Sequence, residues 1–133
     1  MISAVDHIGI AVKDLEASMG LYRTIFGVTE FHREQVVDQG VDIASFSLGG
    51  VRIELTAPLN DDSPIAGFLA KRGEGIHHVA FRTDTINDDL QRLAANNVML
   101  INSVPQPGAH DMLIAFLHPK STGGVLMELC SEK

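Results

Sequence analysis

Large apolar residues alternate with small or polar ones over the stretch from Val5 to Val12, as in a strand buried on one face. Asp14 can then cap a helix that continues to about Phe26, in which apolar residues recur at helical spacing. Gly27 can end this helix. The pattern predicts a strand followed by a helix.

Three further alternating stretches follow, separated by turns at Gly40 and at Gly49-Gly50. We expect strands at about residues 29–37, 41–48 and 51–57. The first part of the chain therefore has the order βαβββ. Ser63 and Pro64 can then cap and start a short helix that continues to about Lys71.

The same order recurs in the second part of the chain. We expect a strand at 76–83, a helix at 85–97 and strands near 98–103, 112–117 and 125–130. The sequence thus predicts an α+β protein with two tandem βαβββ modules. We place the modules at residues 1–57 and 76–133, joined by a linker at 58–75 that carries the short helix.

A histidine near the start of each module and a glutamate near its end share repeat positions. His7 and His78 are 71 residues apart, and Glu54 and Glu128 are 74 apart. Apolar neighbours face the opposite side of each strand, so parity turns all four side chains away from the core. In the pair His77-His78, the same argument selects His78, because His77 shares the parity of the apolar positions.

Two imidazoles and two carboxylates suit a divalent ion of borderline softness, such as Co, with Ni, Zn or Mn as alternatives. A lone strand histidine is more often satisfied structurally than bound to a metal. Agreement of four residues in repeat position and parity favours a shared metal site made of His7, Glu54, His78 and Glu128. Four ligands in an octahedron leave two positions open, enough for two adjacent substrate oxygens.

Composition argues against several functional classes for this protein. The 133 residues are 45% hydrophobic and carry a net charge of −7, which disfavours a nucleic-acid surface. No apolar run is long enough to span a bilayer, so we expect no membrane partner. Cys130 is the single cysteine, and the first residues lack the pattern of a secretion signal. We therefore expect a cytoplasmic protein.

Four stretches carry a family resemblance: DHIGIAV (residues 6–12), APLNDDSPIA (57–66), GEGIHH (73–78) and HPKSTGGVL (118–126). With the doubled βαβββ order and its His and Glu positions, the chain resembles the vicinal oxygen chelate superfamily. That superfamily includes glyoxalase I, extradiol dioxygenases, antibiotic-resistance proteins and methylmalonyl-CoA epimerases. The four stretches are most similar to the epimerases, and the resemblance spans almost the whole chain.

The resemblance implies a curved mixed sheet around a metal-binding cleft, one divalent ion per site and a homodimer. It also implies an isomerase that epimerises C2 of methylmalonyl-CoA through an enolate, with His7, His78 and Glu128 as ligands. In the HPKSTGGVL turn, Lys120 and Ser121 are candidates for contact with this acyl-CoA substrate, although such turns are often purely structural.

Two positions depart from the epimerase pattern. Glu54 stands where many epimerases have Gln, as in bacterial glyoxalase I, and Ile43 stands where several have a Glu that is not a ligand. Epimerisation needs a proton removed on one face and returned on the other. We therefore expect Glu128 and Glu54 to be the two catalytic groups, one on each face.

Three alternatives stay open at this point. A glyoxalase I-type lactoylglutathione lyase, which isomerises the hemithioacetal of methylglyoxal and glutathione, is favoured by Glu54. The His-Pro-Lys turn and the Ser-Pro linker favour the epimerase. A drug-sequestering binder would typically lack the four ligands. An extradiol dioxygenase would typically use two histidines and only one carboxylate.

Overall fold

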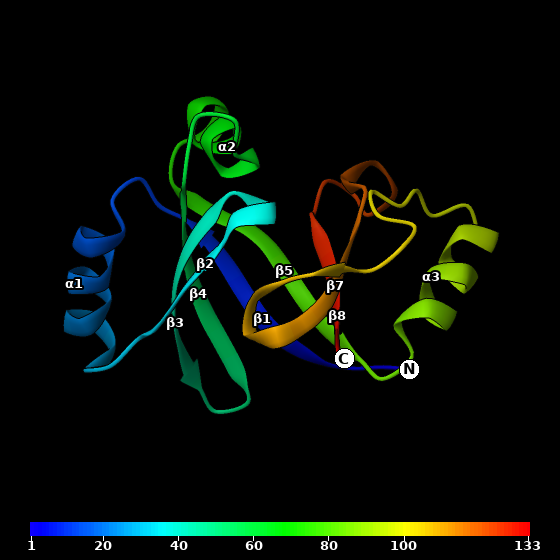
Figure 1. Ribbon diagram of the computed structural model, residues 1–133, viewed down its shortest axis with the longest axis horizontal. Coiled ribbons are helices and arrows are strands. Elements are labelled where there is room, and N and C mark those ends of the chain that lie inside the picture. Colours follow the sequence, from blue (N-terminus) through cyan, green and yellow to red (C-terminus); the bar gives the residue numbers. More distant parts are fainter. The chain divides into compact units, whose positions relative to one another are not determined.

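The computed structural model describes residues 1–133 and divides the chain into two compact units. The split unit consists of Met1–His7 and His78–Lys133, and the inserted unit consists of Ile8–His77. Two strands, β1 (Ile2–Ala11) and β5 (Gly75–Thr83), contribute residues to both units. Figure 1 labels the elements along the chain.

The inserted unit has its strands in the order β2-β3-β4-β1, and β3 is antiparallel to both of its neighbours. Its elements besides the two shared strands are α1 (Leu15–Phe26), β2 (His32–Val36), β3 (Val41–Leu48), β4 (Val51–Pro58) and α2 (Pro64–Arg72). All five were predicted from the sequence, with strand and helix ends shifted by a few residues.

Helix α1 begins and ends as its sequence predicts. The Asp14 side chain accepts a hydrogen bond from the Ala17 amide at 3.0 Å, and Gly27 closes the helix with φ of 69°. The apolar face of α1 packs on β3 and β4, where Leu55 is fully buried. This packing fixes the opposite face of β4 as the one that carries Glu54.

The split unit has the strand order β1-β5-β8-β7-β6, with β5 parallel to β8 and β7 antiparallel to β8. The sheet is therefore mixed. Its remaining elements are α3 (Ile86–Ala95), β6 (Gln106–Pro107), β7 (Met112–Leu117) and β8 (Met127–Glu132). Helix α3 covers one face of this sheet, with Leu90 and Leu129 in the core between them.

The predicted strand at residues 98–103 is wrong. Only Leu100 makes an isolated bridge there, to Leu117, and the short strand β6 lies further along the chain at Gln106–Pro107. The cause is Asn102, whose side-chain oxygen accepts from the Phe116 amide at 2.9 Å. A side chain thus takes the hydrogen bond that a neighbouring strand would accept, and no regular ladder forms.

The α+β class and the doubled order of one helix and several strands are confirmed. The module boundaries proposed from the repeat stay predictions. None of the helices combines the length and apolarity needed to cross a bilayer.

Candidate metal centre

Two histidines from neighbouring strands face each other in the split unit. The Nε2 atoms of His7 on β1 and His78 on β5 lie 3.1 Å apart, and the ring planes meet at 89°. Both side chains are buried, with 5% and 7% of their residue surface exposed. At this separation the two nitrogens can share a hydrogen bond or bind one ion together.

Glu128 on β8 joins the two histidines. Its Oε2 atom lies 3.4 Å from Nε2 of His7, and its Oε1 atom lies 3.7 Å from Nε2 of His78. The parallel register places Glu128 beside Ala80, which is two residues from His78 and on the same face. Met127 packs against the α3 core on the opposite face, as the alternation predicted.

The three residues fit a divalent cation. Metal–ligand bonds of about 2.1 Å place neighbouring ligand atoms roughly 3.0 Å apart in an octahedron and roughly 3.4 Å apart in a tetrahedron. The 3.1 Å between the two Nε2 atoms lies within this range, and the two Glu128 oxygens, at 3.4 Å from His7 and 3.7 Å from His78, lie at its upper end and slightly beyond it. Two imidazoles and one carboxylate are the donor types that Co, Ni, Zn and Mn accept. The arrangement can therefore hold one such ion and leave positions open for a substrate.

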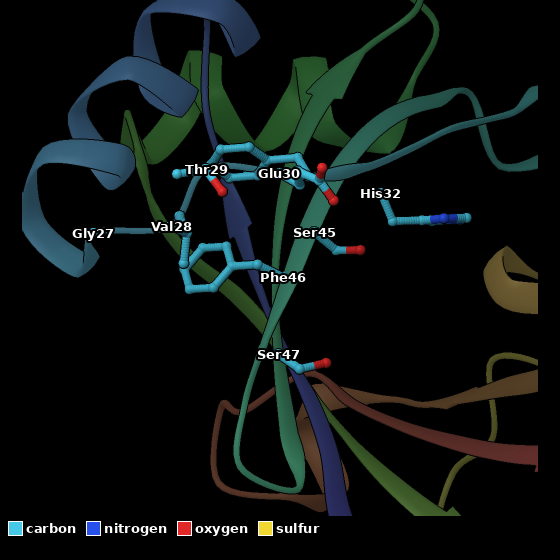
Figure 2. Close-up of a pocket in the computed structure, with 9 residues that line it drawn as sticks. Gly27, Val28, Thr29, Glu30, His32, Ser45, Phe46 and Ser47 are labelled. Carbon is cyan, nitrogen blue, oxygen red and sulfur yellow. The ribbon is translucent and has the colours of Figure 1, made fainter.

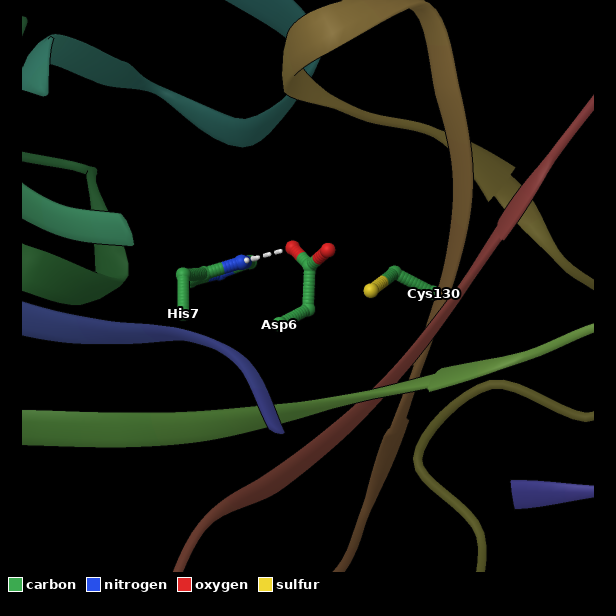
Figure 3. A group of neighbouring side chains, drawn as sticks. All are labelled: Asp6, His7 and Cys130. Carbon is green, nitrogen blue, oxygen red and sulfur yellow. Dashed lines mark hydrogen bonds and ion pairs between the residues drawn. The ribbon is translucent and has the colours of Figure 1, made fainter. Parts of the chain in front are cut away.

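Asp6 supports His7 from behind, and the sequence reasoning assigned it no role. Its Oδ2 atom lies 2.7 Å from Nδ1 of His7, and its Oδ1 atom accepts from Nε and Nη2 of Arg82 at 3.0 and 2.5 Å. The hydrogen bond and the charge of Asp6 raise the pKa of Arg82. Figure 3 shows the Asp6 carboxylate between the His7 ring and Cys130. In the sequence, the only sign of this contact was that Asp6 and His7 are adjacent. Strand parity places adjacent residues on opposite faces, so it did not predict that the two side chains meet.

Glu54 lies on β4 of the inserted unit, with 3% of its surface exposed. Nη2 of Arg52, on the same face of the strand, donates to Oε2 of Glu54 at 3.3 Å. Leu55 points to the α1 core, so the predicted parity of Glu54 is confirmed. Its part in metal binding stays a prediction.

His77 was excluded as a ligand by parity, and its surroundings agree. Its ring packs edge-on against Phe68 of α2, with ring centres 5.0 Å apart. Burial lowers the pKa of His77 to about 4, so this imidazole is neutral near pH 7. The two adjacent histidines thus differ, because His77 packs on a helix whereas His78 contacts His7 and Glu128.

Lys120 and Ser121 lie in a short 3₁₀ turn, Pro119–Ser121, in the split unit. The hydroxyl of Ser121 accepts from the Met99 amide at 2.8 Å, so it helps to hold the preceding irregular segment. Nδ1 of His118 accepts from the Lys120 amide at 3.1 Å and fixes the turn. Lys120 is exposed. Contact of either residue with a substrate stays a prediction.

A shallow hollow of about 590 Å³ lies in the inserted unit, between the end of α1 and β3. Figure 2 shows the ring of Phe46 on one side of β3 and the hydroxyls of Ser45 and Ser47 on the other. The hollow is lined by none of the four predicted ligands. It therefore does not mark the metal site.

Sequence similarity agrees with this geometry. The family profile described as "Glyoxalase/Bleomycin resistance protein/Dioxygenase superfamily" matches residues 6–116, which include His7 and His78. The chain belongs to this superfamily. Membership accounts for the doubled βαβββ order.

Three relatives are similar to this protein over nearly the whole chain. An uncharacterized protein of Bacillus subtilis, YqjC, is 42% identical over 99% of this chain and 94% of its own length. An ethylmalonyl-CoA/methylmalonyl-CoA epimerase of Cereibacter sphaeroides is 39% identical over 97% of this chain and 98% of its own. A solved structure of a methylmalonyl-CoA epimerase in complex with methylmalonyl-CoA and NH4+ has a TM-score of 0.92 and 38% identity, covering 99% of this chain and 96% of that one.

Proposed function

We propose that this protein is a metal-dependent isomerase that epimerises C2 of methylmalonyl-CoA. The observation that carries the proposal is the buried group of His7, His78 and Glu128, in which both carboxylate oxygens lie near the two facing Nε2 atoms within one unit. Full-length similarity to proteins named as methylmalonyl-CoA epimerases supports the choice of substrate.

His7, His78 and Glu128 would hold the cation, and Glu54 is the fourth ligand expected from the sequence repeat. A divalent ion at this position supplies Lewis-acid stabilisation of the negative charge that develops on the substrate oxygens, worth several kcal/mol. The protein groups around it do the remaining work. Burial of the two imidazoles and of the Glu128 carboxylate keeps bulk water from competing for the same positions.

The C2 proton of methylmalonyl-CoA lies between a thioester carbonyl and a carboxylate, so its removal gives a delocalised enolate. The Glu128 carboxylate takes this proton on one face. Inversion requires a second group that already holds a proton and delivers it to the opposite face, and we assign that step to Glu54 in its protonated form. Exchange with solvent then removes the proton from Glu128 and restores the one on Glu54. Each positioned proton transfer contributes about 10² to 10⁴ in rate.

Coenzyme A carries several phosphates, whereas the chain has a net charge of −7. Binding such a substrate requires a local positive group. Lys120, exposed in the Pro119–Ser121 turn, is our candidate for this contact. A cytoplasmic location and a homodimer are part of the same proposal.

The test is a two-substrate assay on protein whose metal content has been measured. Purified protein loaded with Co²⁺ is incubated separately with one epimer of methylmalonyl-CoA and with the methylglyoxal–glutathione hemithioacetal. We expect epimerisation of the first, loss of that activity with a chelator, and recovery when Co²⁺ is restored. Turnover of the hemithioacetal alone would contradict the proposal in favour of a glyoxalase I-type reaction.

His78→Ala provides a matched variant for this assay, with His77→Ala as its neighbour on the opposite face. The first should lose bound Co²⁺ and activity together. The second removes an imidazole that packs on Phe68 and should keep the metal. Equal metal loss in both variants would show that the effect comes from damage to β5 and not from a lost ligand.

A further inference from the structure

The Asp6 carboxylate is enclosed on all the sides that the structure describes. Its side chain has no exposed surface, and the Arg82 side chain is 47% exposed. Burying a carboxylate costs free energy unless hydrogen bonds or an opposite charge compensate its own charge. The groups that contact the Asp6 carboxylate therefore determine its role. Here one oxygen is given to Arg82 and the other to His7.

The two oxygens have separate partners. Nε and Nη2 of Arg82 both donate to Oδ1, whereas Oδ2 lies 2.7 Å from Nδ1 of His7. The guanidinium compensates the charge of Asp6 and prevents the carboxylate from rotating. Oδ2 therefore stays in place as an acceptor, and an acceptor beside Nδ1 requires that this nitrogen carry the proton.

A proton on Nδ1 makes Nε2 of neutral His7 the nitrogen that carries the lone pair and accepts. This Nε2 atom is the one that faces His78 at 3.1 Å and Glu128 at 3.4 Å. Metal-binding histidines commonly give their other ring N–H to a carboxylate, which sets the tautomer and the direction of the ring. Asp6 and His7 show the same pattern.

We propose that Asp6, anchored by Arg82, is a positioning residue that holds His7 in its Nδ1–H tautomer with Nε2 aimed at the metal position. The inference rests on the proposed metal centre. Asp6, His7 and Cys130 also have ligand atoms within 4.8 Å of one another (Figure 3). Because both Asp6 oxygens already accept hydrogen bonds, we assign Asp6 to support and not to ligation.

The first test needs no variant. The ring nitrogens of His7 are observed by ¹⁵N NMR in metal-free protein, and we expect a protonated Nδ1 and an unprotonated Nε2. Observation of the opposite tautomer in the wild-type protein would overturn the inference, whatever the protein's activity.

The second test is Asp6→Asn, which keeps the size of the side chain and removes its charge. We expect a mixture of His7 tautomers, because an amide can donate as well as accept, and a 10- to 100-fold weaker affinity for Co²⁺ in a chelator competition. Arg82→Gln keeps the contact with His7 but removes the anchor, so its affinity should fall between those of the wild type and Asp6→Asn.

Asp89→Asn is the matched control. Asp89 is also a buried carboxylate of the split unit that accepts from a neighbouring arginine, Arg92, but its partners lie around α3. Its variant should bind Co²⁺ as the wild type does and keep the His7 tautomer. Equal losses in Asp6→Asn and Asp89→Asn would assign both effects to general destabilisation and overturn the inference.

Metal binding separates the proposed function from the positioning role of Asp6. If wild-type protein binds no divalent ion, the proposed function and this inference both fall. If the wild type binds Co²⁺ and Asp6→Asn binds it equally well with an unchanged tautomer, only the positioning role of Asp6 is lost.

Discussion

Nε2 of His7 and Nε2 of His78 lie 3.1 Å apart although 71 residues separate them along the chain. The two residues occupy equivalent places at the start of the two predicted modules. Glu128, at the end of the second module, lies within 3.7 Å of both. Duplication of a simple strand–helix order can thus generate a ligand group without any contiguous motif.

Glu128→Gln tests the proposed base. We expect the variant to fold and to exchange the C2 proton of methylmalonyl-CoA with deuterated solvent at least about 100-fold more slowly, because an amide cannot accept that proton. Deuterium incorporation followed by mass spectrometry measures this. Glu132→Gln, an exposed position on the same strand, should leave exchange unchanged. Undiminished exchange in Glu128→Gln would remove Glu128 from the mechanism.

Glu54→Gln separates ligation from proton transfer at the second carboxylate. Gln can still offer an oxygen to a metal ion but cannot carry a proton, so we expect retained Co²⁺ and a loss of epimerisation of about 10² to 10⁴. The exposed Glu30→Gln serves as the control in the same unit. Activity close to that of the wild type would show that Glu54 has no role in proton transfer.

The half-buried imidazole of His77 should make the metal-free protein sensitive to acid. Its pKa is lowered to about 4 in the folded protein by burial, against about 6.5 in an unfolded chain. Between these values the unfolded state binds the extra proton, so the free energy of unfolding falls as pH decreases from about 6.5 to about 4. We expect this group to account for roughly 1–3 kcal/mol of that loss.

Urea unfolding at several pH values, compared with His77→Asn, measures the contribution of His77. The variant should lose less stability on acidification than the wild type does. Parallel curves for the two proteins would contradict a neutral, buried His77.

Asp14→Ala tests the start of α1. Loss of the hydrogen bond from the Ala17 amide should lower the free energy of unfolding by about 1 kcal/mol. Asp14→Asn retains an accepting oxygen and should come within a few tenths of a kcal/mol of the wild type. Thermal or urea unfolding checks both, and equal losses would show that the cap bond is unimportant.

Strand parity explains why the faces that carry the predicted ligands could be predicted. The apolar residues of β8 face α3, so Glu128 must lie on the other face of the strand. By the same reasoning, His78 and His77 lie on opposite faces of β5. Periodicity gives the face on which a residue lies but not its partners. Asp6 was missed for that reason, since its role depends on hydrogen bonds to His7 and Arg82.

The predicted strand at residues 98–103 failed for a related reason. Its apolar residues suggested regular pairing, but Asn102 provides the acceptor for Phe116 through its side chain. Local hydrogen bonds of this kind compete with a ladder and leave no trace in the alternation of apolar and polar residues.

The chain leaves the split unit directly after His7 and returns to it at His78, so the whole inserted unit is a loop between two ligand positions. An ion bound by both imidazoles, which are 71 positions apart, would tie the ends of this loop together, much as a disulfide does. For a loop of that length, a cross-link lowers the conformational entropy of the unfolded chain. The free energy of unfolding rises by roughly 4 kcal/mol as a result. The cation would then stabilise the inserted unit as well as its own site, and a chelator would lower the free energy of unfolding of segments far from the chemistry.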